Sequence, residues 1–268
     1  MKDIVELSKN IRKHSLKMVH KSKASHIGSC LSCADILAHL YSNWLRVDPK
    51  NPDWPDRDRF ILSKGHAAAA IYATLGLIGF FPLSWLDSYS CDDAKLGGHI
   101  NHTSAPGVEV SSGSLGHGLP IGVGMALGAK REQKKYRVVV LLSDGECDEG
   151  SNWEALLLGS THNLDNLLVI IDYNKLQAYG RVNEVAILEP FAKKLRAFNC
   201  SVKEINGHDH LSIASALSLF PFEENKISII LAHTVKGKGI SFMEDSLPWH
   251  YKSPSDEQLA VALAELED

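Results

Sequence analysis

The second half of the chain alternates between short apolar runs and longer segments of helical length. Four apolar runs have the length of buried strands. They lie at 138–143, 167–172, 201–205 and 227–232. Three helix-length segments separate them, near 151–162, 189–198 and 211–219. Alternating strands and helices, with nearly all-apolar strands, predict an α/β fold: a parallel sheet with helices on both faces.

The first half predicts helices around one short strand, at 60–62. The helices are expected at 3–22, 34–45, 67–76, 82–88 and 116–131, and a last one at 255–266. Residues 23–29 form a polar loop, and residues 91–114 form an irregular stretch too long to be an idle connection in a compact domain. The sequence contains no linker, repeat or low-complexity segment, so we expect a single domain over residues 1–268.

Composition and charge narrow the possible classes of protein. A net charge of −4 gives no electrostatic reason to expect nucleic acid or an anionic membrane as a partner. No apolar stretch reaches the roughly 18 residues of a spanning helix, and the first residues resemble an amphipathic helix rather than a signal peptide. Five cysteines, an odd number, do not suggest a disulfide framework, so a cytoplasmic location is expected.

Cys30 and Cys33 form a CxxC pair, which is typical of redox and zinc sites. A redox pair would need a preceding strand, and a zinc site would need a second pair of ligands. Neither is visible in the sequence, so we favour two small residues that pack at the start of a helix.

Polar residues follow two of the predicted strands at the point where each strand ends. Asp144 and Gly145 follow the run 138–143, and Asn174 follows the run 167–172. Parallel strands end at the same edge of a sheet, so a carboxylate and an amide oxygen should lie side by side there and could bind a hard divalent cation. The turn 145–151 opens a helix whose free N–H groups favour an anion. Together these features predict a metal–diphosphate site.

Histidine is abundant, with 13 residues, and several lie in predicted loops. These are His26, His66, His99, His102, His117, His208 and His250. A single loop histidine is usually a solvated surface residue. Several that face one edge could donate hydrogen bonds to a diphosphate or to sugar hydroxyls and could shuttle protons near neutral pH. They show neither the i, i+4 spacing nor the tight His/Cys cluster of a zinc site.

These motifs resemble the thiamine-diphosphate-binding half of transketolases. Residues 143–150 with 154–155 and 172–175 are similar to the metal motif of that family, which many thiamine enzymes share. Further matches are to its three histidine loops, its cofactor loop and its closing loop. They lie at 23–28, 62–67, 98–99, 106–116 and 234–250. The matches keep their order from about residue 10 to 255, nearly the whole chain.

The resemblance implies a fold, a cofactor and a set of site residues. The fold would be that of the thiamine-diphosphate-binding PP domain, with thiamine diphosphate and Mg²⁺ or Ca²⁺ as cofactors. The metal would be bound by the side chains of Asp144 and Asn174 and by the Leu176 carbonyl. The cofactor-binding residues would be His66, Gly113, Ser114, Leu115, Asp144, Gly145, Glu146, Glu149, Asn174 and His250. The residues facing the reactive carbon, and handling the hydroxyl protons of a ketose, would be His26, His66, His99 and His250.

Glu149 has two interpretations. The resemblance places it at a subunit interface, in a hydrogen-bonded acidic network. The alternative, from its position alone, is a carboxylate at a helix N-terminus, where the helix dipole favours negative charge.

Full-length transketolases continue into a pyrimidine-binding domain, which carries the catalytic glutamate, and a C-terminal domain. This chain ends at Asp268, so we expect the N-terminal subunit of a split transketolase that is inactive alone. Its partner would be a separate C-terminal subunit, in an α2β2 assembly. The assembly would transfer a two-carbon ketol unit from a ketose, or ketose phosphate, to an aldose, or aldose phosphate.

Two alternatives remain open: the α subunit of a 2-oxo acid dehydrogenase E1 component, and a non-catalytic cofactor-binding fragment. The early histidine loops and the loop 236–250 favour transketolase over the dehydrogenase.

Overall fold

The computed structural model describes residues 1–267 and contains one sheet of five parallel strands. The strands are β1 (Arg59–Leu62), β2 (Val138–Ser143), β3 (Leu167–Tyr173), β4 (Ser201–Asn206) and β5 (Ser228–His233). Their order across the sheet is β1-β2-β3-β5-β4. The predicted strands and the predicted α/β class are confirmed.

Helices precede, separate and follow the strands. They are α1 (Lys2–Ser22), α2 (Ile27–Ser32), α3 (Ala34–His39), α4 (Ala68–Leu77), α5 (Gly118–Arg131), α6 (Gly150–Thr161), α7 (Val182–Val185), α8 (Phe191–Ala197), α9 (His210–Ser218) and α10 (Asp256–Glu265). A π-helical turn and four 3₁₀ turns complete the elements. They are η1 (Leu40–Trp44), η2 (Gly65–Ala67), η3 (Leu83–Ser88), η4 (Gly145–Asp148) and η5 (Leu247–His250).

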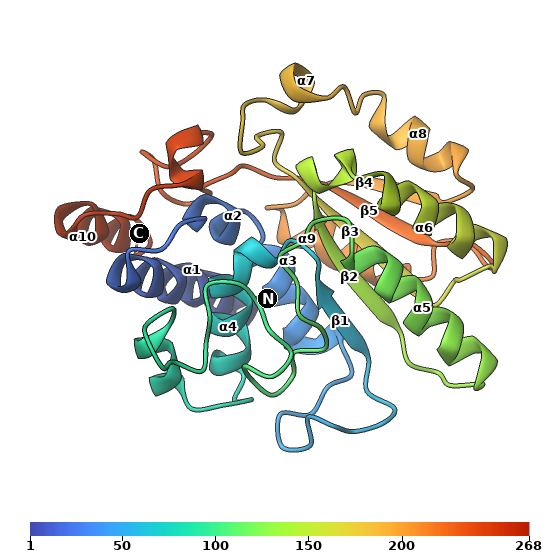
Figure 1. Cartoon of the computed structure of the whole chain (residues 1–268), viewed down its shortest axis with the longest axis horizontal. Coiled ribbons are helices and arrows are strands. Elements are labelled where there is room, and N and C mark those ends of the chain that lie inside the picture. Colours follow the sequence, from blue (N-terminus) through green and yellow to red (C-terminus); the bar gives the residue numbers. More distant parts are fainter. Residues whose placement is uncertain (268) are drawn as a thin grey trace.

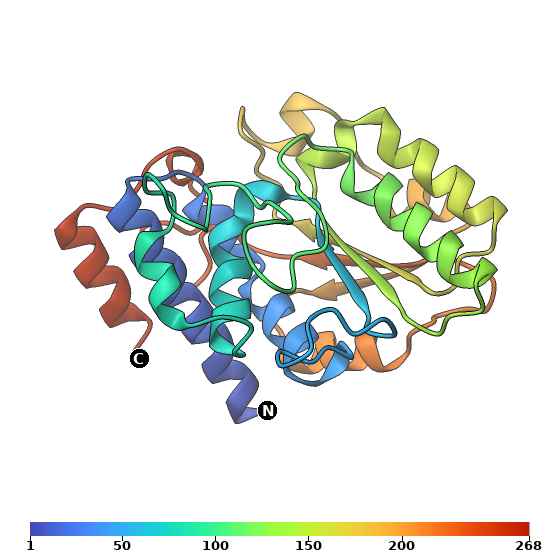
Figure 2. The same cartoon turned by 60° about the horizontal axis from the view of Figure 1, so that its bottom comes forward.

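Both faces of the sheet are buried, because successive side chains of a strand point to opposite faces. On β2, Val139 and Leu141 pack into the core shared with α1, α3, α4 and α9, whereas Val138 and Val140 pack into the core shared with α5, α6 and α8. Figures 1 and 2 show α5 and α6 on one side of the sheet and α1 and α4 on the other. Because helices cover both faces, the central strands are apolar at most of their positions.

Two helical regions depart from the sequence prediction in detail, and one predicted strand is less buried than the others. The predicted helix 34–45 breaks after His39 into the turn η1, where the Leu45 amide donates to the Leu40 carbonyl, 2.8 Å away. The six residues of α2 are all buried, so the helix lacks a polar face and its sequence gives no amphipathic signal. β4 is an edge strand with exposed and half-buried positions, which explains why it is less apolar than the central strands.

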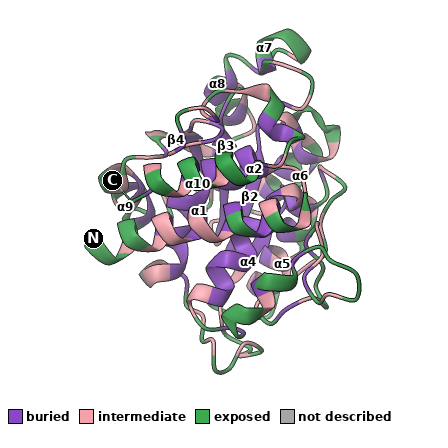
Figure 3. Cartoon of the chain, turned by 90° about the vertical axis from the view of Figure 1, so that its left-hand side faces the viewer, coloured by how far each residue is buried: buried purple, intermediate pink, exposed green. Residues whose placement is uncertain are grey.

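Burial varies strongly among the helices. Figure 3 shows α4 buried along almost its whole length and α10 at the surface with exposed positions. Over residues 1–267, we find no helix with the length and apolar character that crossing a membrane requires.

Cys30 and Cys33 lie on α2 and at its junction with α3, and both side chains are buried. Burial raises the pKa of the Cys30 thiol to about 11 and that of Cys33 to about 12. Redox and metal-binding cysteines need a lowered pKa, because the thiolate is the reactive form. The structure therefore fits the packing interpretation of this pair.

Candidate active site at the carboxyl edge of the sheet

A cleft of about 390 Å³ lies at the carboxyl edge of the sheet. The loops that follow β1, β2, β3 and β5 all contribute to it, because parallel strands end on the same side. Its lining includes the residues His26, His66, His99, Gly113, Leu115, Asp144, Gly145, Glu149, Asn174, Leu176, Gln177, Lys236 and His250. Most of the predicted site residues therefore meet in one cavity.

Asp144 and Asn174 lie together, as the strand spacing predicts. Ser143 pairs with Asp172 in the β2–β3 register, so both strands end at the same level. The Asp144 carboxylate accepts hydrogen bonds from the Gly145 amide (2.7 Å) and the Lys175 amide (2.5 Å). Burial, aided by the nearby Asp172 carboxylate, raises the pKa of Asp144 to about 6. A cation beside this carboxylate would compensate the desolvation of its charge.

A second buried carboxylate, that of Asp172, lies near Asp144, and a lysine of the chain balances its negative charge. Asp172 forms an ion pair with Lys64, and both side chains are fully buried. Ser32 and Thr234 also donate hydrogen bonds to the Asp172 carboxylate. Burial alone would raise the pKa of Asp172, but Lys64 and the hydrogen bonds hold it below its ordinary value. Asp172 is therefore a structural partner of Lys64, and Asp144 is the carboxylate that lines the cleft.

Four histidines from separate parts of the chain meet at the cleft. The ring centroid of His26 lies 5.3 Å from that of His66, 5.8 Å from that of His99 and 4.8 Å from that of His250. The backbone also ties the cluster together, because the His26 amide donates to the His250 carbonyl, 2.9 Å away.

Three of these histidines have lowered pKa values. Burial, with His99 and Lys236 nearby, lowers the pKa of His26 to about 4. Burial together with Lys236 lowers that of His250 to about 3, and burial together with Lys64 lowers that of His66 well below 6.5. These imidazoles are therefore neutral at neutral pH, so each can donate one hydrogen bond and accept another. The Nδ1 atom of His26 is buried and has no partner among the described residues.

Two residues predicted to bind the cofactor do not line the cleft. Ser114 is exposed and does not belong to the cleft lining, although the resemblance assigns only its backbone to the cofactor rings. The Glu146 carboxylate is fully buried and accepts hydrogen bonds from the Ser63 hydroxyl and from the amides of Gly116 (3.0 Å) and Ser143 (3.2 Å). Glu146 thus anchors the loop that precedes α5, so its carboxylate is engaged within the chain.

The remaining loop histidines lie outside the cluster. His102 contacts the Ser111 hydroxyl at 2.9 Å, and His117 contacts the Leu115 carbonyl at 3.0 Å. His208 contacts Asp35 in a separate network. Their loop positions gave no means of distinguishing them from the clustered histidines.

Lys236 is a site residue that our interpretation of the sequence did not single out. Its side chain is buried, and its Nζ lies 2.7 Å from the Leu176 carbonyl oxygen and 2.8 Å from His250 Nδ1. Burial lowers its pKa to about 8. Gly28 leaves room for the stem of this lysine, because a Cβ at residue 28 would lie 3.0 Å from Lys236 Cγ. The sequence feature that could have indicated Lys236 as a site residue is its position, as a basic residue just past the end of β5.

The donor groups fit a divalent cation bound together with a diphosphate. Asp144 offers a carboxylate, Asn174 an amide oxygen and Leu176 a backbone carbonyl, which are hard oxygen ligands. Within residues 1–267, no group of three or more His, Cys, Asp or Glu side chains is placed to hold a metal ion. A cation here would therefore need further oxygen ligands, which a diphosphate supplies. Lys236 provides positive charge on the same wall.

Fold and site together define an α/β protein with a polar ligand cleft at the carboxyl edge of its parallel sheet. Residues 4–262 match the family described as the transketolase, thiamine diphosphate binding domain. The chain belongs to the transketolase family, and the predicted assignment to an N-terminal transketolase subunit is confirmed.

Two curated relatives are separate subunits of similar length. An apulose-4-phosphate transketolase subunit of Actinobacillus succinogenes is 41% identical, over 99% of this chain and 96% of that protein. The 6-deoxy-6-sulfo-D-fructose transketolase subunit SqwG of Clostridium sp. strain MSTE9 is 39% identical, over 99% of this chain and 96% of that protein.

Among solved structures, the transketolase of Campylobacter jejuni superimposes with a TM-score of 0.94 at 33% identity. The match covers 100% of this chain but only 43% of the Campylobacter chain. The likeness therefore concerns less than half of that transketolase.

Proposed function

We propose that this chain binds the diphosphate end of thiamine diphosphate together with Mg²⁺ or Ca²⁺. The cation would be held by Asp144, Asn174 and the Leu176 carbonyl, and the diphosphate would be held by Gly145, His66 and His250. Lys236 adds a positive charge that suits the same anion. The observation that carries the proposal is the meeting of this metal-type donor set with four histidines in one cleft.

The histidine cluster suits the handling of sugar hydroxyl protons. Thiamine diphosphate supplies a nucleophilic ring carbon that attacks a ketose carbonyl. The imidazoles of His26, His66, His99 and His250 would bind the ketose hydroxyls and move protons at their ring nitrogens. The unpaired His26 Nδ1 favours a hydrogen-bonding group from outside the chain at this point. Gly113 and Leu115 would form the wall beside the cofactor rings.

A second subunit would complete the site. We infer a separate C-terminal transketolase subunit, which would bring the pyrimidine-binding domain and its catalytic glutamate, in an α2β2 assembly in the cytoplasm. Two apolar side chains on the cleft wall support a covering partner, because Tyr179 is 85% exposed and Val185 is 43% exposed. Glu149, also exposed on this wall, would lie at the interface between subunits. The relatives named as subunits support a separate partner chain.

The substrates would be a ketose donor and an aldose acceptor, each free or phosphorylated, between which a two-carbon ketol unit passes. The named relatives act on different sugars, apulose 4-phosphate and 6-deoxy-6-sulfo-D-fructose. Their names support a donor from among the less common ketoses. We therefore propose a ketose as the donor class and name no individual sugar.

The test is to purify the chain with a candidate pyrimidine-domain subunit, sought first among the neighbouring genes, and to assay ketol transfer between a panel of ketoses or ketose phosphates and aldoses. We expect transfer that requires both subunits, thiamine diphosphate and a divalent cation. Pyruvate-dependent reduction of an artificial electron acceptor, without ketol transfer, would instead indicate a 2-oxo acid dehydrogenase. Absence of both activities in a stable, cofactor-loaded complex would contradict a catalytic role.

A further inference from the structure

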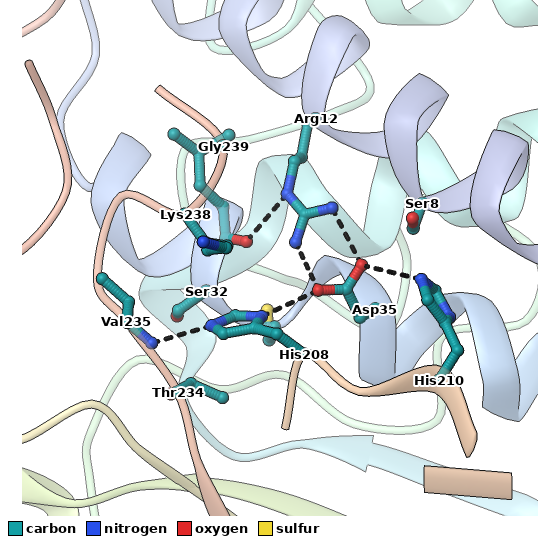
Figure 4. A network of polar contacts seen from close by, with 12 residues as sticks. Ser8, Arg12, Ser32, Asp35, His208, His210, Thr234, Val235, Lys238 and Gly239 are labelled. Carbon is teal, nitrogen blue, oxygen red and sulfur yellow. Dashed lines mark hydrogen bonds and ion pairs between the residues drawn. The ribbon is translucent and has the colours of Figure 1, made fainter. Parts of the chain in front are cut away.

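A buried polar network contacts the loop that carries Lys236, outside the cleft. In Figure 4, Arg12 from α1 and His208 from the β4–α9 connection both point at the carboxylate of Asp35 on α3. Arg12 makes two hydrogen bonds to Asp35, at 2.8 and 2.5 Å, and His208 Nδ1 lies 2.8 Å from the same carboxylate. Burial opposes the charge of Asp35, but Arg12 and His208 hold its pKa far below its ordinary range.

The second nitrogen of His208 connects this network to the active-site loop. The backbone amide of Val235 donates to His208 Nε2, 2.8 Å away, as Figure 4 shows. A ring nitrogen can accept from an amide only if it carries no proton. The Asp35 carboxylate therefore selects the tautomer with hydrogen on Nδ1, and Nε2 is left free to accept from Val235.

This hydrogen bond lies just beyond the last backbone hydrogen bond between β3 and the chain that follows β5. β3 ends at Tyr173, and its carbonyl accepts from the Thr234 amide at 3.2 Å. The next amide, that of Val235, is held by His208, and the residue after it is Lys236. Gly207 permits the close approach, because a Cβ there would lie 2.5 Å from Thr234 Cγ2.

We propose that His208 is a positioning residue for Lys236, through the Asp35–His208–Val235 chain of hydrogen bonds. His208 fixes the backbone just past β5, so the Lys236 side chain points into the cleft toward the diphosphate. The inference rests on the proposed binding of thiamine diphosphate. A residue that merely stabilised the fold would affect stability without acting specifically through Lys236.

The chain offers matched variants for the test. His208→Asn keeps a polar atom near the Nδ1 position but loses the acceptor for Val235, whereas His208→Gln can place an amide oxygen near the Nε2 position. His210→Asn is the control, because His210 Nε2 lies 3.7 Å from the same Asp35 carboxylate and His210 Nδ1 contacts His39 at 2.9 Å, away from the 234–237 segment.

The experiment measures thiamine diphosphate affinity by titration calorimetry with Mg²⁺ in excess. It uses the full chain, co-purified with its partner subunit if that is needed for measurable binding. We expect His208→Asn to weaken binding roughly five- to tenfold, as for loss of one hydrogen bond, with partial recovery in His208→Gln and little change in His210→Asn. In a Lys236→Met background, His208→Asn should change affinity by less than about twofold, since the two residues act in series.

A second readout does not depend on the cofactor. In the ligand-free chain, His208→Asn should speed hydrogen exchange in the 234–237 segment, whereas His210→Asn should not. Additive effects of His208→Asn and Lys236→Met, or unchanged exchange in this segment, would overturn the positioning role. If the single variant Lys236→Met binds thiamine diphosphate as tightly as the wild-type chain, Lys236 does not bind the diphosphate. In that case the hydrogen-exchange rates of residues 234–237 still decide whether His208 holds this segment in place.

Discussion

Lys236 donates a hydrogen bond from its Nζ to the carbonyl oxygen of Leu176, 2.7 Å away. The family resemblance assigns that same oxygen to the metal ion. An ammonium group and a divalent cation repel each other, so binding of the metal would turn the lysine from the carbonyl toward the negative diphosphate. In the ligand-free chain this contact gives the buried ammonium group of Lys236 a hydrogen-bond partner. It also keeps the ammonium group beside the place where the diphosphate would bind.

The first prediction concerns this lysine. Lys236→Met removes the charge but keeps most of the apolar stem, so thiamine diphosphate binding should weaken about 10- to 100-fold, the range for losing a charge-assisted hydrogen bond. Titration calorimetry checks the affinity. Lys238→Met is the control, because Lys238 is half-buried and pairs with Glu244 at 3.0 Å. Equal affinity of the two variants would refute the role of Lys236.

The second prediction contrasts two buried aspartates, both at most 2% exposed. Asp144→Ala should abolish metal-dependent cofactor binding while the far-ultraviolet circular dichroism stays native, because this carboxylate has no charged side-chain partner in its hydrogen bonds. Asp58 is paired with Arg46 and Arg137 near the opposite end of the strands. Removing its charge leaves two arginines without their partner, so Asp58→Ala should lower the free energy of unfolding by roughly 3–5 kcal/mol.

The readouts for this pair are cofactor titration and urea denaturation of each variant. Tight thiamine diphosphate binding by Asp144→Ala would disprove the metal assignment. A native unfolding midpoint in Asp58→Ala would show that its ion pairs do not support the fold.

The strands and the Asp144–Asn174 pair could be predicted from the sequence because both follow from local rules. Apolar runs of strand length mark buried parallel strands, and parallel strands must end at one edge. The inner structure of the site depended on long-range contacts. Lys64 and Asp172 are far apart in the sequence and neutralise each other in the core, and nothing local marks either one as structural. For the same reason the contacts of the Glu146 carboxylate with Ser63 and Gly116 could not be predicted from its place beside the metal motif.

The third prediction concerns the cysteines. Cys30, Cys33, Cys147 and Cys200 are buried, and Cys91 is exposed. Burial also raises the pKa of each of the four buried thiols, which lowers their reactivity further. Under native conditions an aromatic disulfide reagent should therefore modify Cys91 first, and Cys91→Ser should remove the fast phase. Rapid reaction of a second thiol in that variant would revive a reactive role for the Cys30–Cys33 pair.

The fourth prediction concerns an ion pair between two loops beside the cleft. Arg181 follows β3 and Asp245 follows β5, and they form two hydrogen bonds of 2.9 and 2.7 Å. Both side chains are about half exposed, at 46% and 51%, so the pair should contribute little to global stability. Arg181→Gln should leave the melting temperature unchanged but speed hydrogen exchange in residues 177–182 and 240–249. Unchanged exchange in both loops would show that other contacts hold them.

The last prediction concerns acid stability and the histidine cluster. The pKa of His26 is about 4 in the folded chain, compared with 6.5 as its ordinary value. Between these values the unfolded chain binds a proton that the folded chain does not, so the free energy of unfolding falls as the pH drops from about 6.5 to about 4. Above pH 6.5 this contribution is fully present, because His26 is neutral in both states.

His26→Gln should therefore reduce the loss of stability between about pH 7 and about pH 5, measured as urea midpoints at each pH. His117→Gln is the control, because that side chain is exposed and lies outside the cluster. His250 and His66 also have lowered pKa values, so part of the acid sensitivity should remain in His26→Gln. An unchanged pH dependence in His26→Gln would mean that His26 is not buried in the neutral form.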